Sequence, residues 1–364
     1  MRKSKLTRRA LSIAVAGVMA VSSAPAALAW TTSDEVTERE TRNGELAVRA
    51  AEEGMVLLRN DGTLPLPEGS NIALYGNGAV CTVKGGTGSG NVNQRNIVNY
   101  YQGLKEVYNV VNTDYLEAYE ADWNKAQAGE MGEEGTDYVG SQTGFGSTVF
   151  FGKEVPITDA ADVAANNDVD CAVYVVSRIS GEGADRAAQE NDGDYYLSEV
   201  ERANLELLTQ TFDKVVVILN TANVIDTNFI DEIEGINAVV LGSQGGMYSG
   251  TALANILTGA ATPSGKLVDT WPVDFMDFPS SPTFGENYDP DNPQQEYNEY
   301  YYDDIYVGYR YFDTFNVDPK FEFGYGLSYT TFDVEPVCVE AEAQNVPVSV
   351  KVTNTGDTYS GKEV

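Results

Sequence analysis

The sequence contains no histidine and few basic residues. Its 364 residues include three Cys, and 23 Lys and Arg stand against 55 Asp and Glu, for a formal net charge of −32. The lack of histidine excludes Ser-His-Asp and Cys-His catalysis, a His general base and a His-ligated zinc site. If the protein is an enzyme, its proton transfers must use mainly carboxylates, or Tyr or Lys.

The shortage of basic residues also argues against anionic partners. A nucleic-acid-binding face needs clustered Lys and Arg, and an anionic membrane surface is disfavoured for the same reason. No stretch beyond the N-terminus reaches the ~18 apolar residues of a membrane span. Cys81, Cys171 and Cys338 form no CxxC pair and predict neither a disulfide framework nor a zinc knuckle, although a Cys81–Cys171 bridge stays open. We expect no metal, cofactor, nucleic acid or membrane span.

Residues 1–29 have the pattern of a secretory signal peptide. Basic residues precede the apolar stretch 10–21, and Ala27-Leu28-Ala29 is a small-x-small cleavage site. The sequence therefore predicts a secreted or extracellular protein whose mature chain begins at Trp30. An uncleaved membrane anchor is the alternative.

Residues 30–330 alternate short apolar runs with helical patterns. Apolar runs occur at 55–58, 71–76, 108–111, 171–176, 214–219 and 237–241, and helical patterns at 45–53, 96–105, 116–125, 159–165, 198–212, 226–233 and 249–257. This alternation predicts an α/β fold: a three-layer α/β/α sandwich with a largely parallel sheet, in which 171–176 is the central strand. Residues 127–152, rich in Gly, Glu and Thr, are interpreted as an inserted surface loop.

The pattern changes toward the C-terminus. Asp289, Asp291 and Glu296 could bind calcium, but their spacing fits no EF-hand and favours solvated loop acids. The aromatic block at 300–332 favours a packing seam between domains over a stacking platform for sugar. Residues 331–364 alternate like the first strands of an incomplete β-sandwich, so we expect a truncated chain that naturally continues.

Three glycine-containing loops follow the expected strands, at 84–90, 180–186 and 242–246. The carboxyl ends of parallel strands meet at one edge of a sheet, so these loops should form one ligand-facing edge. Around Gly88 and Ser89, missing side chains would let backbone N–H groups reach a ligand. The first loop lacks the GK[ST] ending of a P-loop, which disfavours a nucleotide site.

The middle loop contains one acid between two glycines. Glu182 stands between Gly181 and Gly183, and Asp185 and Arg186 follow shortly after. An acid just beyond a buried parallel strand is well placed for chemistry. The alternative is an ordinary solvated loop acid.

Six segments, taken in order, resemble glycoside hydrolase family 3, the β-glucosidase family. They are AAEEGMVLLRNDGTLPL at 50–66, KGGTGSGNVN at 84–93, SRISGEGADR at 177–186, PSGKLVDTWP at 263–272, YVGYRYFDTF at 306–315 and FGYGLSYTTF at 323–332. The resemblance covers about residues 45–364. It implies an (α/β)6 sandwich at 30–330, the start of a fibronectin type III-like domain at 331–364, and a (β/α)8 barrel as a further domain of the same chain.

The resemblance also implies a function. Glu182 would be the general acid/base of a secreted retaining β-glycosidase of β-glucosidase type, acting on oligosaccharides or β-glucosides with terminal β-linked sugars. The nucleophilic Asp would lie in a barrel after Val364, as in a permuted subgroup, so the 364-residue chain alone should be inactive. Retaining glycosidases need two carboxyl groups roughly 5–5.5 Å apart.

The acid of such a pair needs a raised pKa. A cation touching Glu182 would oppose this, so we expect Arg186 to pair with Asp185 and leave Glu182 free. Two other classes of function stay open. One is a non-catalytic carbohydrate-binding or surface module. The other is a flavodoxin-like nucleotide module, which the missing P-loop Lys and the acidic charge disfavour.

Overall fold

The structure is a computed structural model. It describes residues 34–87, 92, 94–131, 137–144, 147–180, 186–188, 190–191, 193–284, 298, 300–339 and 346–363. The chain divides into two compact units, Met1–Glu45 and Leu46–Val364, and every strand of the structure belongs to the second unit. Within the described ranges, no helix has the length and apolar character needed to cross a membrane. The same ranges hold no cluster of carboxylates and cysteines suited to a metal ion.

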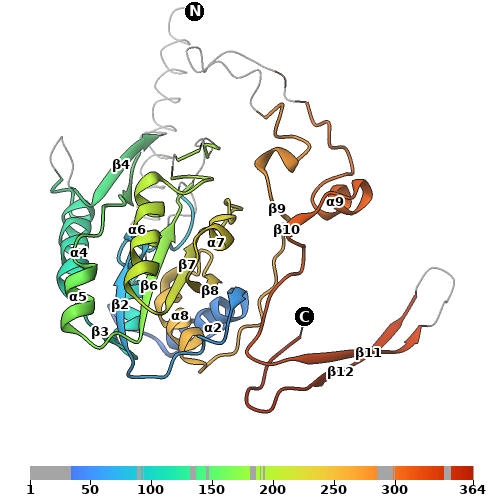
Figure 1. Cartoon of the computed structure of the whole chain (residues 1–364), viewed down its shortest axis with the longest axis horizontal. Coiled ribbons are helices and arrows are strands. Elements are labelled where there is room, and N and C mark those ends of the chain that lie inside the picture. The colour runs from blue at the N-terminus through green and yellow to red at the C-terminus, as the bar shows by residue number, and fades with distance from the viewer. Residues whose placement is uncertain are drawn as a thin grey trace, which may run out of the picture. The chain divides into compact units, whose positions relative to one another are not determined.

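A six-stranded sheet forms the centre of this second unit (Figure 1). Its strands are β1 (Val56–Asn60), β2 (Asn71–Tyr75), β3 (Asn109–Val110), β6 (Cys171–Ser177), β7 (Val215–Asn220) and β8 (Ile236–Leu241). They run in the order β1-β8-β7-β6-β2-β3, and only the edge strand β1 is antiparallel to its neighbour. The predictions of a largely parallel sheet and of a central strand at 171–176 are confirmed.

Helices cover both faces of the sheet (Figure 1). The first face packs against α2 (Glu38–Gly54, through Val48 and Ala51), α3 (Tyr100–Leu104), α4 (Thr113–Gln127) and α8 (Ser249–Thr258). The second face packs against α5 (Ala160–Asn166), α6 (Glu199–Thr211) and α7 (Phe229–Glu232). The expected three-layer α/β/α arrangement is therefore present.

The apolar run of β6 explains its central place. Val173 and Val175 point into the core on the α3–α8 face, whereas Tyr174 and Val176 point into the core on the α6 face. All four side chains are buried. Because successive side chains of a strand alternate between faces, only a strand covered on both sides needs an unbroken apolar sequence.

Residues 127–152 contain a hairpin where the sequence predicted an inserted loop, and that prediction was wrong. Strand β4 (Val139–Gly144) pairs antiparallel with β5 (Ser147–Gly152). Val139 is buried, and the ring of Tyr138 packs edge-on against Tyr119 of α4, with centroids 4.5 Å apart. Glycines weaken the strand pattern in the sequence, so the hairpin depends on tertiary contacts with α4.

The remaining elements lie in the turns of the sheet domain and after it. They are η1 (Asn77–Ala79), η3 (Gly246–Tyr248), η4 (Phe275–Asp277), β9 (Trp271–Pro272) paired with β10 (Pro319–Phe321), α9 (Tyr309–Phe315), and β11 (Phe332–Val339) paired with β12 (Val348–Asn354). The alternation after residue 331 does form an antiparallel pair. A fibronectin type III-like domain and the boundaries at 30 and 330 stay predictions. Cys81 and Cys171 are separate buried thiols.

Candidate active site

The carboxyl ends of β6, β7 and β8 are joined through one buried side chain. Asn220, the last residue of β7, is 0% exposed. Its Oδ1 accepts hydrogen bonds from the Val83 N–H at 2.7 Å and the Ser177 hydroxyl at 2.8 Å. Its Nδ2 donates to the carbonyls of Val83 at 2.9 Å and Ser243 at 2.7 Å. The loops after β2 and β8 therefore meet at the ends of β6 and β7.

Backbone hydrogen bonds join the same loops directly. The Thr87 N–H donates to the Ser180 carbonyl at 3.2 Å, and the Gly246 N–H donates to the Lys84 carbonyl at 3.0 Å. The described parts of the three glycine-containing loops thus lie together at one edge of the sheet, as the sequence predicted. Gly88 and Ser89 lie outside the described residues, so their proposed backbone role stays a prediction.

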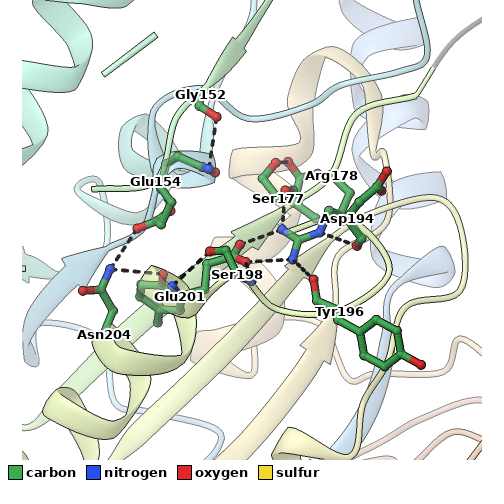
Figure 2. A network of polar contacts seen from close by, with 12 residues as sticks. Gly152, Glu154, Ser177, Arg178, Asp194, Tyr196, Ser198, Glu201 and Asn204 are labelled. Atoms are coloured by element: carbon green, nitrogen blue, oxygen red, sulfur yellow. Dashed lines mark hydrogen bonds and ion pairs between the residues drawn. The ribbon is translucent and has the colours of Figure 1, made fainter. Parts of the chain in front are cut away.

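A buried ion pair lies at the start of the loop that follows β6 (Figure 2). Arg178 Nη1 and Nη2 donate to the two carboxylate oxygens of Glu201 at 2.6 and 2.9 Å. The two side chains are 5% and 2% exposed. Nε of Arg178 also donates to the Asp194 carbonyl at 2.6 Å. Arg178 is thus bonded both to helix α6 and to the returning end of its own loop.

Glu201 has a second role that explains why it lies there. Ser198 is the N-cap of α6: its hydroxyl accepts from the Glu201 N–H at 3.2 Å, and its own N–H donates to Glu201 Oε2 at 2.8 Å. This reciprocal arrangement is a capping box at the start of the helix expected at 198–212. The helix start therefore sets the position of the carboxylate that receives Arg178.

Arg186 bonds to the same returning segment. Its Nε donates to Asp194 Oδ1 at 2.5 Å, and its Nη2 donates to the Asp194 carbonyl at 2.7 Å. The Ala187 N–H donates to Asp194 Oδ2 at 2.6 Å. Both arginines thus converge on Asp194 and connect the two described ends of the loop, at 178–180 and 186–188.

The acid between those ends is not described. Glu182 and Asp185 lie outside the described residues, so the acid/base assignment and the predicted Arg186–Asp185 pair stay predictions. The described partner of Arg186 is Asp194, on the far side of the loop. This contact places an arginine charge against a carboxylate other than Glu182.

A second carboxylate, Glu154, lies beside the ion pair (Figure 2). The Asn77 N–H donates to its Oε2 at 3.0 Å, and Asn204 Nδ2 donates to its Oε1 at 3.2 Å. Loss of solvent, followed by the nearby Glu201 charge, raises the pKa of Glu154 to about 8 despite these hydrogen bonds. Glu154 is therefore largely protonated at neutral pH.

These groups border a cavity of about 440 Å³, whose lining includes Asn77, Glu154, Ser177, Arg178, Asp194 and Glu201. Sequence reasoning assigned no role to Arg178, Asp194, Glu201 or Glu154. The one available signal was the Ser198–Glu201 spacing of a capping box just after the loop. The ion pair and the partly buried Glu154 carboxyl could not be inferred from the sequence, because their partners lie 16 to 77 residues apart.

Comparison with known proteins gives the family. The family described as Glycosyl hydrolase family 3 C-terminal domain matches residues 55–329, which include the whole sheet and both arginines. The chain belongs to glycosyl hydrolase family 3. The resemblance found in the sequence motifs is thereby confirmed, and the loop after β6 is a loop of the family 3 C-terminal domain.

Similar family 3 proteins include a β-glucosidase from Ruminococcus albus, 37% identical over 322 residues. That match covers 88% of this chain and 31% of the relative. β-Glucosidase A from Butyrivibrio fibrisolvens is 36% identical over 361 residues, covering 88% of this chain and 40% of the relative. The family 3 chain therefore spans about a third to two fifths of these two relatives.

Solved family 3 structures show the same fold. β-Glucosidase 3B from Thermotoga neapolitana in complex with α-D-glucose superposes with a TM-score of 0.72 at 36% identity, covering 88% of this chain and 43% of that one. A β-glucosidase from Paenibacillus barengoltzii gives a TM-score of 0.72 at 37% identity, covering 87% and 33%. The mixed α/β architecture is therefore that of family 3 C-terminal domains.

Proposed function

We propose that this chain carries the general acid/base of a secreted retaining β-glycosidase of β-glucosidase type, and that Glu182 is that residue. The proposal rests on how the two described ends of the loop after the central strand β6 are held together. Its described ends are bonded to each other through Arg178, Arg186 and Asp194. Glu182 lies between those ends in the sequence.

The electrostatics of the loop ends support this role. A general acid must hold its proton near neutral pH, so it must avoid a neighbouring cation. Both arginines are already bonded to carboxylates, Arg178 to Glu201 and Arg186 to Asp194. Their charges are therefore partly offset: Arg178 still lowers the pKa of the nearby Glu154, but loss of solvent and the Glu201 charge keep that pKa raised.

The mechanism assigns two proton transfers to Glu182. As an acid it protonates the oxygen of the departing sugar while a nucleophilic carboxylate attacks the anomeric carbon. As a base it then takes a proton from the water that hydrolyses the glycosyl-enzyme. The nucleophile is proposed to be an Asp of a (β/α)8 barrel, outside these 364 residues. By itself the chain should therefore not hydrolyse aryl β-glucosides measurably.

The test replaces Glu182 by Ala in the complete natural protein that contains this chain. kcat/KM should fall roughly 10²–10⁴-fold on cellobiose, the usual size of general acid–base catalysis, because a sugar alkoxide needs protonation to leave. The loss should be much smaller on a dinitrophenyl β-glucoside, and azide should accelerate turnover. Equal losses on both substrates with no azide effect would refute the role of Glu182, as would leaving-group dependence in Asp185→Ala alone.

A further inference from the structure

A second cavity, of about 450 Å³, lies next to the proposed acid/base loop. It is bounded by α4, by β5 and by the turn at 80–87, and Ile179 at the start of the loop lines it as well. The Thr87–Ser180 backbone hydrogen bond joins its wall to the same loop. Its volume lies in the usual range of small-molecule sites.

Aromatic rings form one part of the lining. Trp123 of α4 and Phe150 and Phe151 of β5 line the cavity, and each is only partly buried. Trp123 and Phe150 pack against the core on one side. Tyr115, Tyr119 and Tyr138 nearby pack against one another, whereas within the described residues none of the three lining rings packs against another ring. Apolar ring surface is therefore left for a ligand.

Polar side chains of α4 form another part of the cavity lining. Glu120, Trp123, Asn124 and Gln127 follow the i, i+3, i+4, i+7 spacing that places residues on one helix face, and all four line the cavity. In the part of the chain that the structure describes, the side chains of Glu120, Asn124 and Gln127 make no hydrogen bond. Their amide and carboxylate groups are free to bind a ligand rather than the protein.

The charge of the cavity indicates a neutral ligand. Glu120 disfavours an anion. The one lining amine, Lys84, donates to the Val92 carbonyl and to Gln94, which uses two of its three N–H donors, and its positive charge balances the negative charge of Glu120. Rings together with planar amide and carboxylate groups suit a pyranose, which has an apolar C–H face and a rim of hydroxyl groups.

We propose that this cavity binds a sugar unit on the leaving-group side of the bond that is cut. The proposal rests on the proposed function, because a general acid protonates the oxygen that leaves with the departing sugar. That sugar must therefore lie on the side of the acid's own domain, and this cavity shares Ile179 with the loop that carries the acid. Trp123 would stack on the sugar, and Asn124 and Gln127 would bind its hydroxyl groups.

The first test measures binding without turnover. The 364-residue chain with Trp30→Phe is titrated with cellobiose, laminaribiose and xylobiose while tryptophan fluorescence is followed. The remaining tryptophans are Trp123 and the buried Trp271, so a saturable change reports on Trp123. We expect saturation at millimolar concentrations for at least one disaccharide. No saturable change with any of the three would overturn the proposal.

Variants then assign the binding to the cavity. Gln127→Ala should weaken binding several-fold to about tenfold, the usual range for one hydrogen bond. Gln210→Ala on α6, an equally exposed Gln on the other face of the sheet, should leave it unchanged. Trp123→Ala should abolish binding measured by calorimetry. If the Trp123→Ala variant does not fold, the comparison of Gln127→Ala with Gln210→Ala is the test. Equal affinity of these two variants for the disaccharide would refute the site.

A kinetic measurement separates this proposal from the role of Glu182. In the complete natural protein, Gln127→Ala should raise KM for the bound disaccharide several-fold and leave KM for an aryl β-glucoside unchanged, because the aryl group makes no hydroxyl contacts. An equal rise for both substrates would overturn the leaving-group assignment. The titration should be unaffected by Glu182→Gln, so a failure of the acid/base role leaves the binding result standing.

Discussion

Arg178 and Glu201 form a bidentate ion pair in which both side chains are almost fully buried. The pair joins the end of the central strand β6 to the first turn of α6. Arg178 also donates to the Asp194 carbonyl, so the pair fixes the start of the loop relative to its end. The effect of the pair on the free energy of unfolding is best measured by removing one partner, because an unpaired buried charge destabilises the folded state.

Glu201→Gln should therefore destabilise the protein strongly. The amide preserves the shape and the capping box but leaves the buried Arg178 guanidinium without the carboxylate that binds it, at a cost of about 3–5 kcal/mol. The free energy of unfolding is measured by urea denaturation. Its matched control is Arg202→Ala, which breaks the exposed Arg202–Glu232 pair and should cost less than about 1 kcal/mol. Similar losses in both variants would contradict the role assigned to the buried pair.

Glu154 should make stability depend on pH. Its pKa is about 8 in the folded protein against an ordinary value of 4.5, so the folded state keeps a proton that the unfolded chain loses. The free energy of unfolding should therefore fall as pH rises from about 4.5 to about 8, by up to about 1.4 kcal/mol per pH unit.

Glu154→Gln removes this proton equilibrium and keeps the hydrogen-bonding shape. Relative to the parent protein, the variant should gain stability steadily across that pH window, as measured by denaturation at a series of pH values. Glu206→Gln, an exposed carboxylate on α6, serves as the control and should give a difference that hardly changes with pH. A constant difference for Glu154→Gln would show that its carboxyl group is ionised throughout.

Asp194→Ala should open the loop between the two arginines. It removes the carboxylate that receives Arg186 and the Ala187 N–H, and hydrogen bonds to charged groups contribute about 1.5–3 kcal/mol each. A glutamyl endopeptidase that cuts after Glu182 should then act at least about tenfold faster, since cleavage follows the population of open states. The rate is measured by mass spectrometry of the products.

Asp213→Ala provides the comparison for this proteolysis. Asp213 is exposed just after α6, and removing it should not change the rate of cleavage after Glu182. Equal rates for the parent and Asp194→Ala would mean that Asp194 does not hold the loop.

The sheet was largely predictable because its signal is local. β6, β7 and β8 are largely apolar runs, and such runs are typical of strands covered on both faces. The cap at Ser198 was predictable for the same reason, since a capping box lies within four residues. The β4–β5 hairpin was not, because Val139 and Tyr138 acquire their packing partners from α4 only after folding.

What the sequence alone determined is the fold class, the family motifs and the edge of the sheet where polar loops meet. These follow from periodicity, from glycine placement and from the rule that parallel strands present their carboxyl ends together. Tertiary structure alone decided which charges meet. Arg178 pairs with Glu201, and Arg186 pairs with Asp194. Glu154 accepts a hydrogen bond from Asn204. Ion pairing and pKa depend on distance and on exclusion of water, and neither quantity is encoded by spacing along the chain.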